Sequence, residues 1–359
     1  MELTQLTQPV AGFTREVSQG LRVAVVGATG AVGGEFLSLF ESRRLPVQSL
    51  RLLASERSVG KTMIFRDEAH TVELLSEAAF EGIDIAFFSA GATRSREFVP
   101  AALAAGARVI DNSSAFRMRA DVPLVVPEVN PDALTESDRL LAVANCTAII
   151  LCVGIAGLRT LGRFSRLIVS TYQSASGGGA QMMHHLEEAT RAYLDPTHPT
   201  PAPIPGLPEY AFNLFSHNTP ILENGYNDEE NKVIAETRKI LGMDDLPISA
   251  TCVRVPVLRA HSESVTLEFD GPAPSVEDVR AALDSAPGVT VVDDRALNHF
   301  PTPRLASHQN DVLVGRIRQD LSNPNAVQLF LCGDQLLKGA ALNAVQIAEL
   351  ALEKGFIKS

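Results

Sequence analysis

The chain has 359 residues, enough for two domains of ordinary size, and hydrophobic residues make up 45% of it. It carries 31 lysines and arginines against 42 aspartates and glutamates, and the net charge of −11 argues against general binding to nucleic acid or anionic membranes. No apolar run approaches the roughly 18 residues of a membrane span, and four cysteines without a CxxC pair are typical of a reducing cytoplasm.

The first part of the chain alternates between strand-like and helix-like patterns. Residues 1–20 are polar and aperiodic, without a secretory signal, and are interpreted as a disordered or added extension outside the fold. Strands are predicted at 22–26, 49–54, 83–89, 108–111 and 140–144, and helices at 35–40 and 94–105. This alternation predicts a Rossmann-type, doubly wound parallel sheet over residues 21–146, which is the α/β fold class.

The second part has longer strands with clearer alternation of polar and apolar residues. Strands are predicted at 167–173, 248–256, 262–269 and 327–332, helices at 179–193, 228–241 and 276–284, and a Pro-rich loop at 195–208. The pattern predicts an α+β domain over residues 147–334 whose sheet is covered on one face. An amphipathic helix is predicted at 335–354, and residues 335–359 are expected to return to the first domain.

A glycine-rich turn lies between the first predicted strand and the first helix. Its glycines let the backbone approach a pyrophosphate closely, and the helix N-terminus presents unpaired N–H groups to it. The alternative is a tight strand–helix turn without a ligand. We predict nucleotide binding, with candidate contacts at Gly27, Thr29, Gly30, Ala31, Val32 and Gly33.

The preference between the two nicotinamide coenzymes is expected to depend on the turn after the second strand. Glu56 in that turn would suit the ribose hydroxyl of NAD, so NAD stays open. Ser55, Arg57 and Ser58 crowd the same turn and suit a 2′-phosphate better. The sequence therefore favours NADP.

Cys146 follows a predicted strand and opens a predicted helix, directly after Asn145. At a helix N-terminus the dipole favours thiolate, the form that attacks acyl carbons. The alternative for a single cysteine is a small buried hydrophobe, which is how Cys152 and Cys332 are interpreted. We predict that Cys146 is a nucleophile.

Charged residues near other predicted strands are candidates for substrate contacts. Arginine binds a carboxylate through two parallel hydrogen bonds, and histidine exchanges protons near neutral pH, which makes Arg254 and His261 candidates. Glu229 and Lys232 lie three residues apart on one helix face, and the alternative there is a solvated ion pair. Cys252 shares a strand face with Arg254, so its place relative to the site is left open.

Two further loops follow predicted strands. Arg117 comes after the strand that ends at residue 111, where the carboxyl ends of parallel strands form a cleft. A second glycine-rich loop at 173–179 contains Gln173, Ser176 and Gly177 and can approach a cofactor closely. The adjacent histidines at 184–185 diverge on a helix and no carboxylate or cysteine has ligand spacing, so no metal site is predicted.

The motifs together resemble the aspartate-semialdehyde dehydrogenase family. In family order they are VAVVGATGAVG, LLASERSVGK, DNSSAFRM, NCT, QSASGGG, EENK, RVPVLRAHSES and DQLLKGAALNAVQIAE, which span Leu21 to the C-terminus. Two positions depart from the family pattern: Ala144, where many members have proline, and Ala260, where glycine is common. Neither removes a reactive group, so they bear on local geometry.

The resemblance implies a role for each candidate residue. Cys146 would form an acyl thioester, His261 would be the proton-transfer residue and Gln173 would orient the substrate. Around them, Arg254 would hold the α-carboxylate, Glu229 would face the ammonium group, Arg117 and Lys232 would receive phosphate, and Asn145 would line the substrate site. The implied NADP contacts are residues 29–32, Arg57, Ser58, Ser176, Gly177 and Gln335.

The implied activity is NADPH-dependent reductive dephosphorylation of L-aspartyl-4-phosphate to L-aspartate 4-semialdehyde, reversible with inorganic phosphate, on the way to lysine, threonine, methionine and isoleucine. The family also implies a cytoplasmic homodimer or dimer of dimers, with no nucleic-acid or membrane partner. One alternative is another acyl-phosphate reductase, such as N-acetyl-γ-glutamyl-phosphate reductase, whose acylated substrate amine would make Glu229 unnecessary. A second is a non-catalytic NADP-binding scaffold, against which the presence of Cys146, Arg254 and His261 argues.

Overall fold

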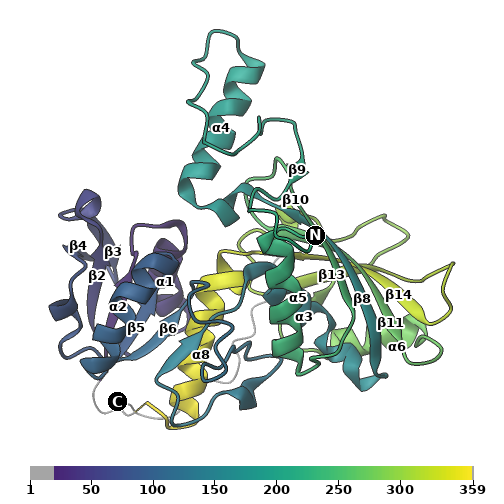
Figure 1. Cartoon of the computed structure of the whole chain (residues 1–359), viewed down its shortest axis with the longest axis horizontal. Helices are drawn as coiled ribbons and strands as arrows, with labels where there is room; N and C mark the ends of the chain where they lie inside the picture. The colour runs from purple at the N-terminus through teal and green to yellow at the C-terminus, as the bar shows by residue number, and fades with distance from the viewer. Residues whose placement is uncertain (1–19, 358–359) are drawn as a thin grey trace.

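The first domain is a doubly wound sheet, as the alternating pattern predicts. In the computed structural model, which describes residues 20–357, its seven strands have the order β3-β4-β2-β1-β5-β6-β7 (Figure 1). All neighbouring pairs are parallel except β3 with β4. The strands are β1 (Leu21–Val26), β2 (Val47–Ala54), β3 (Thr62–Phe65), β4 (Glu68–Leu74), β5 (Ile85–Phe88), β6 (Arg108–Asp111) and β7 (Leu140–Ala142). Apart from Gly20, the extension expected at 1–20 lies outside the described residues.

Helices cover both faces of this sheet. In β1, Val23 and Val25 pack into the core formed with α1 (Ala31–Ser42), whereas Ala24 and Val26 pack into a second core with α2 (Ala92–Ala104). Burial on both faces explains why the strand is a nearly continuous apolar run. The glycine-rich turn therefore lies at the carboxyl end of the central strand, directly before α1.

The second domain is a mixed sheet with the order β12-β13-β14-β11-β8-β10-β9. Its strands are β8 (Phe164–Gln173), β9 (Phe215–Ser216), β10 (Ile248–Arg254), β11 (His261–Phe269), β12 (Val289–Val291), β13 (Val312–Gln319) and β14 (Ala326–Gly333). Helices α3 (Cys146–Ala156), α5 (Asp228–Leu241) and α6 (Val276–Asp284) pack on one face. Val265 and Leu267 of β11 are buried under them, whereas Ser264 and Thr266 on the other face are half-buried. This confirms the α+β arrangement with one covered face.

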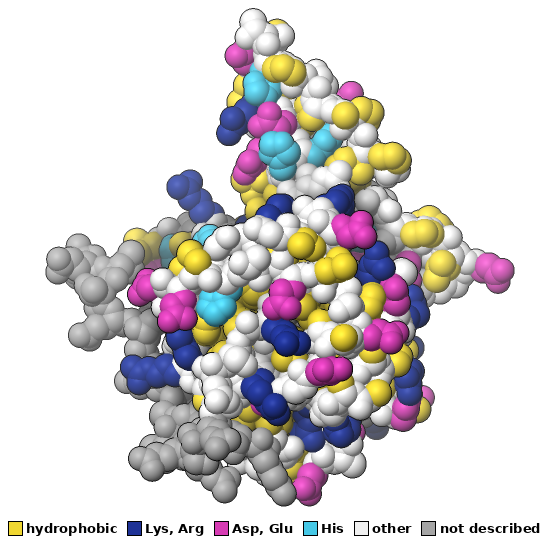
Figure 2. Space-filling view, turned by 90° about the vertical axis from the view of Figure 1, so that its left-hand side faces the viewer, with side chains coloured by type: hydrophobic (Ala, Val, Ile, Leu, Met, Phe, Trp, Pro, Cys, Tyr) yellow, Lys and Arg dark blue, Asp and Glu magenta, His cyan; other side chains and the backbone are white. Residues whose placement is uncertain are grey.

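A segment around α4 (Ala180–Leu194) projects from the second domain (Figure 1). The predicted Pro-rich loop follows it without regular helix or strand. Large apolar side chains along the projection are exposed, namely Tyr193, Leu194, Phe212 and Leu214. Figure 2 shows the projection standing clear of the body with hydrophobic side chains along it.

Residues 337–353 pack between the two domains, against α1, β6 and α3 (Figure 1). The single helix expected at 335–354 is instead a π-helical turn at Leu337–Ala341 followed by α8 (Leu342–Glu353). Glu349 of α8 forms an ion pair at 2.6 Å with Arg43, which follows α1. Arg259 likewise joins Glu35 of α1 (2.7 Å) to Asp334 of the second domain (2.6 Å).

Several short elements were not predicted: β3, β4, β9, β12 and β13, the short helix α7 (Pro303–Ala306), and 3₁₀ turns at Glu56–Ser58, Glu77–Phe80, Pro131–Ala133, Gly157–Thr160 and Ala175–Gly178. Most of these elements have too few residues to show a repeating pattern of apolar and polar side chains. In β13, Gly315 and the arginines at 316 and 318 interrupt the apolar pattern. Among residues 20–357, no helix is long and apolar enough to cross a membrane.

Candidate active site

Cys146 is the first residue of α3, at the N-terminus that the sequence predicts. Asn145 caps the helix, because its Oδ1 accepts hydrogen bonds from the backbone N–H groups of Thr147 (3.0 Å) and Ala148 (3.2 Å). The helix that follows is buried on all sides. The position of the cysteine is therefore fixed by a capped helix inside the core.

The sulfur of Cys146 lies 3.5 Å from Nε2 of His261. His261 is the first residue of β11 and is fully buried, and β11 is held on both sides by β8 and β14. On the other side of the ring, Nδ1 accepts a hydrogen bond from the backbone N–H of Ser174 at 3.0 Å. Two residues that are 115 positions apart thus form a thiol–imidazole contact on rigid elements.

The surroundings of Cys146 act on the pKa of its thiol in the direction opposite to the helix N-terminus, which favours the thiolate. Burial of the sulfur, together with the Glu229 carboxylate, raises the pKa of the thiol to about 12, although Arg254 and Arg117 act in the opposite direction. Burial also lowers the pKa of His261 to about 3, and Arg254 lowers it further. These surroundings therefore favour the uncharged form of both groups of the pair.

Glu229 of α5 connects two other candidate residues. Its Oε1 accepts hydrogen bonds from Nδ2 of Asn145 (2.9 Å) and Nε2 of Gln173 (3.0 Å), and its side chain is buried. Burial alone would raise the pKa of this carboxyl, but nearby His217 and the two amides hold it below its usual value. Since both amides use one oxygen, Oε2 has no hydrogen-bond partner among residues 20–357.

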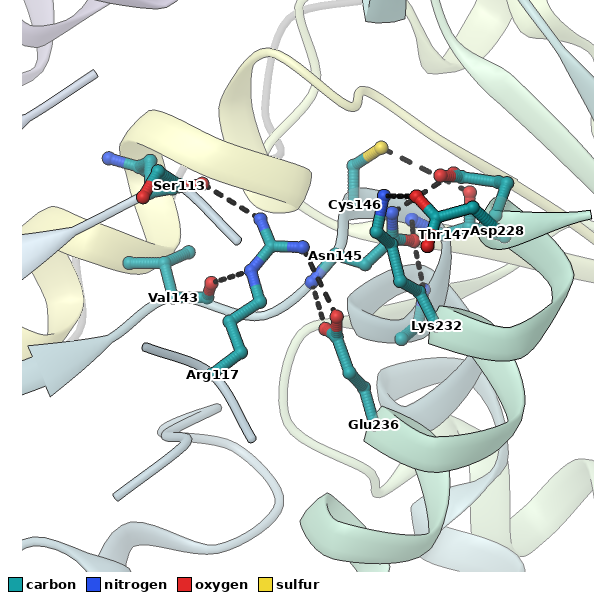
Figure 3. A network of polar contacts seen from close by, with 12 residues as sticks. Ser113, Arg117, Val143, Asn145, Cys146, Thr147, Asp228, Lys232 and Glu236 are labelled. Atoms are coloured by element: carbon teal, nitrogen blue, oxygen red, sulfur yellow. Dashed lines mark hydrogen bonds and ion pairs between the residues drawn. The ribbon is translucent and has the colours of Figure 1, made fainter. Parts of the chain in front are cut away.

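The cations expected to receive phosphate belong to two ion pairs with acids that the sequence analysis did not single out. Lys232 pairs with Asp228 at 2.5 Å, so Glu229 is not its solvated partner. Arg117 contacts Glu236 at 3.2 Å and donates to the carbonyl oxygen of Val143 at 2.8 Å. Figure 3 shows both groups beside the N-terminus of α3.

Arg254 ends β10 beside the second glycine-rich loop. Its guanidinium is buried and donates from Nη1 to the carbonyl oxygen of Ser174 at 2.9 Å. A Cβ on Gly177 would lie 3.0 Å from that Nη1 and 3.1 Å from Nε2 of His261. A glycine at 177 therefore lets the loop approach both side chains.

The predicted coenzyme residues form two groups. In the first, Thr29 donates a hydrogen bond to Ser58 at 3.0 Å, which joins the glycine-rich turn to the turn with Ser55 and Arg57. In the second, Gln335 donates to Oγ of Ser176. The two groups come from different domains, and the Arg259 ion pairs connect these domains.

The first group fits a dinucleotide. A Cβ on Gly33 would lie 2.3 Å from the carbonyl oxygen of Gly27, so this close turn requires glycine. No side chain caps α1 at Gly30, which leaves its first N–H groups for a pyrophosphate. Arg57 is exposed, so its guanidinium is accessible to a ligand from solvent.

Cys252 lies in the hydrophobic core and is fully buried, so it lies under the site and does not line it. Ala260 has φ of 72°, a left-handed conformation that explains why glycine is common there. The sequence analysis did not single out Glu236, which pairs with Arg117, His217, which lowers the pKa of Glu229, or Ser174, which bonds His261. It also did not single out Gly339, where an added Cβ would lie 2.8 Å from Cβ of Cys146. A signal existed for Glu236, because residues 229, 232 and 236 follow the i, i+3, i+7 spacing of one helix face.

Comparisons with known proteins cover both domains. A family model described as "Semialdehyde dehydrogenase, NAD binding domain" matches residues 22–137, and one described as "Semialdehyde dehydrogenase, dimerisation domain" matches residues 155–338. The aspartate-semialdehyde dehydrogenase of Synechocystis sp. is 51% identical over 337 residues, which are 94% of this chain and 99% of that protein. The Bacillus subtilis protein of the same name is 44% identical over 93% of this chain and 98% of its own length.

Solved structures give the same result. Aspartate semialdehyde dehydrogenase II from Vibrio cholerae superposes with a TM-score of 0.88 at 39% identity, covering 93% of this chain and 99% of that one. A second crystal structure of that enzyme, complexed with ASA, also has a TM-score of 0.88, at 38% identity over 93% and 99% of the two chains.

Proposed function

The chain belongs to the aspartate-semialdehyde dehydrogenase family, and we propose that it converts L-aspartyl-4-phosphate into L-aspartate 4-semialdehyde with NADPH, and catalyses the phosphate-dependent reverse reaction. The observation that carries the proposal is the contact between Cys146 Sγ and His261 Nε2, beside the carboxylate of Glu229. A nucleophile, a proton-transfer group and a site for a substrate ammonium thus meet at one helix N-terminus.

The first step is attack of Cys146 on the acyl carbon. The S–H bond breaks as the carbon–sulfur bond forms, and Nε2 of His261 would take the thiol proton. The bond from carbon to the phosphate oxygen breaks, and phosphate leaves toward Arg117 and Lys232. Three of the five N–H groups of Arg117 are engaged with Val143, Glu236 and Asn112 among residues 20–357, which leaves two for a phosphate. The product of this step is a thioester on Cys146.

Reduction then places negative charge on the former carbonyl oxygen. NADPH, when bound, supplies the hydride for this reduction. The N–H groups of Asn145, Thr147 and Ala148 are already bonded, so the backbone N–H of Cys146 is the donor at the start of α3 that would stabilise the oxyanion, at about 3 kcal/mol in comparable sites. His261, in contact with Sγ, is assigned the proton transfer that accompanies release of the aldehyde. The same groups would serve the oxidation of the aldehyde with phosphate as the acceptor.

Substrate recognition rests on two opposite charges. Arg254 is a buried guanidinium that suits the α-carboxylate, and the second oxygen of Glu229 is available for the ammonium group. Gln173 donates to the same carboxylate and would orient the substrate. A buried acid near the nucleophile supports a free amino group over an acylated one, and so disfavours N-acetyl-γ-glutamyl-phosphate.

The coenzyme is proposed to be NADP. Residues 27–33 would hold the pyrophosphate, and Ser55, Arg57 and Ser58 would contact the 2′-phosphate. Ser176, Gly177 and Gln335 would contact the nicotinamide half from the second domain. Glu56 is exposed in the same turn, so NAD is the competing coenzyme in the assay below.

A homodimer is proposed through the second domain. The apolar side chains of the α4 projection, such as Tyr193 and Phe212, are exposed on a single copy and would be covered by a second one (Figure 2). The four cysteines are all free thiols, which suits a reducing compartment, and we place the protein in the cytoplasm.

The test is phosphate-dependent reduction of NADP⁺, followed by absorbance, with aspartate semialdehyde and N-acetylglutamate semialdehyde as competing substrates. We expect turnover with the free amino aldehyde and at least a hundredfold less with the acetylated one. Cys146→Ser should lose turnover and retain NADP binding, because a serine hydroxyl without a strong base is a far weaker nucleophile. Equal rates with both aldehydes, or an active Cys146→Ser variant, would refute the assignment.

A further inference from the structure

The two cations that are proposed to receive phosphate come from different domains. Arg117 lies on the segment that follows β6 of the first domain, and Lys232 lies on α5 of the second domain. Residues 112–123, called here the Arg117 loop, form no regular helix or strand. The position of Arg117 relative to Lys232 therefore depends on the contacts between the Arg117 loop and α5.

Lys239 of α5 holds the main chain of the Arg117 loop. Its ammonium nitrogen Nζ donates hydrogen bonds to the carbonyl oxygens of Arg117 (2.7 Å), Arg119 (2.8 Å) and Val122 (3.0 Å). An ammonium group has three hydrogens, so these three carbonyls use all of its donors. One cation thus fixes the backbone of the loop at three points onto the helix.

Glu236, one turn before Lys239, holds the side chain of the same arginine. Its carboxylate contacts Nη1 of Arg117 at 3.2 Å and also accepts the backbone N–H of Asn145. Figure 3 shows the guanidinium of Arg117 pointing toward Glu236. Residues 232, 236 and 239 follow the i, i+4, i+7 spacing of one helix face. This face of α5 therefore carries one proposed phosphate cation and holds both the main chain and the side chain of the other.

The alternative for Lys239 is an ordinary surface lysine that pairs with a carboxylate. Asp121 lies in the same loop, but its carboxylate pairs with Arg119. Lys239 is half-buried, and its hydrogen-bond partners among residues 20–357 are main-chain oxygens. Bonds from one cation to three carbonyls fix a backbone conformation, whereas an exposed ion pair joins two side chains that are free to move.

We propose that Lys239 is a positioning residue of the phosphate site, which fixes the main chain of Arg117 against α5 and so sets the separation of Arg117 and Lys232. This inference rests on the proposed function. Lys239 itself would not contact phosphate, because its three hydrogens face carbonyl oxygens. Its loss should therefore weaken phosphate binding and leave the contacts to the coenzyme and to the amino-acid part of the substrate in place.

The kinetic test is Lys239→Met in the NADP⁺-reduction assay, with phosphate, aspartate semialdehyde and NADP⁺ varied in turn. Methionine retains an unbranched side chain and removes the three donors. We expect the KM for phosphate to rise about three- to tenfold, because water replaces the lost hydrogen bonds only in part. The value of kcat at saturating phosphate should change by less than about twofold, since the reacting groups are untouched. The KM values for the aldehyde and for NADP⁺ should stay unchanged.

The matched control is Arg238→Met. Arg238 is the chain neighbour of Lys239 and has the same charge, but it donates to the carbonyl oxygen of Leu246, outside the Arg117 loop, at 2.8 Å. Both variants lose one positive charge at the same end of α5, so the control separates the position of Arg117 from the net charge. An unchanged KM for phosphate in Lys239→Met, an equal rise in Arg238→Met, or an equal rise of all three KM values would overturn the proposal.

Hydrogen–deuterium exchange tests the same contact without turnover. We expect peptides that cover residues 112–123 to exchange at least about threefold faster in Lys239→Met than in the wild type or in Arg238→Met, because the loop opens more often without its tie to α5. Equal exchange in the two variants would also overturn the proposal. A wild-type enzyme that needs no phosphate would instead refute the proposed function, so the two failures are distinguishable.

Discussion

Gly339 is expected to be essential for the position of the nucleophile. A Cβ at this residue would lie 2.8 Å from Cβ of Cys146 and 3.2 Å from Cβ of Gln335, whereas ordinary contacts begin at 3.4 Å. Gly339→Ala must therefore move Cys146 or its neighbour by about 0.6 Å. Cys146 is held by a capped, buried helix, and Gln335 is held by hydrogen bonds to Ala260 and Ser176. Displacing either residue therefore costs free energy, because the surrounding core is closely packed.

The expected loss in Gly339→Ala is catalytic and structural. Overpacking of a core costs about 1–3 kcal/mol of unfolding free energy, and displacement of a reacting atom by about 1 Å can cost ~10²-fold in rate. We expect kcat to fall at least about tenfold in the NADP⁺-reduction assay, with a lower Tm. Gly34→Ala is the matched control, because nothing lies within 4 Å of its added Cβ. A Gly339→Ala enzyme with unchanged kcat would show that the close contact does not position the sulfur.

Three further predictions concern the coenzyme, the substrate and a buried acid. Arg57→Ala should weaken NADP binding about tenfold or more and leave NAD binding nearly unchanged, as measured by titration, because a charge-assisted contact contributes about 1.5–3 kcal/mol. Glu229→Gln should slow the free amino aldehyde and spare an analogue without the amine, and equal slowing in steady-state kinetics would exclude the ammonium contact. Glu263 is fully buried, neither of its carboxylate oxygens has a hydrogen-bond partner within residues 20–357, and burial raises its pKa well above the usual value. The Glu263 carboxyl thus binds its proton more tightly in the folded than in the unfolded protein. The free energy of unfolding should therefore fall as pH rises above the unfolded pKa of about 4.3. Glu263→Met should remove this fall and gain about 1–3 kcal/mol at pH 8 in chemical denaturation, and parallel stability curves would contradict it.

Features that depend on a few neighbouring residues could be predicted from the sequence. The strand–glycine–helix pattern around Gly27 and the strand–Asn–Cys–helix pattern around Cys146 each place a group by local geometry alone. The doubly wound fold follows from the same local signals, because alternating strands and helices have few stable arrangements. Strand β13 was missed because a glycine and charged residues break its period.

Features that depend on residues far apart in the chain could not be predicted. Glu236 bonds the backbone of Asn145 across 91 positions, and Ser174 bonds His261 across 87. The groups that act on the thiol of Cys146 are also far from it in the chain. The helix N-terminus is visible in sequence, but the burial and the nearby Glu229 carboxylate that raise the pKa of the thiol come from the assembled fold.

Helix α5 covers one face of the second sheet and also supplies two acidic side chains to the candidate site. Glu229 and Glu236 are two turns apart on one face, and both bond Asn145, one through its side-chain amide and the other through its backbone N–H. A capping box at Asn227 fixes the start of the helix, so the spacing of the two acids is set by helical geometry. Burying two carboxylates is costly unless each has a firm partner. In the proposed function, Glu236 holds Asn145, the residue before the nucleophile, and Glu229 binds the substrate ammonium. Both acids lie on α5, so one helix would position both the substrate and the sulfur, which accounts for the cost of burying them.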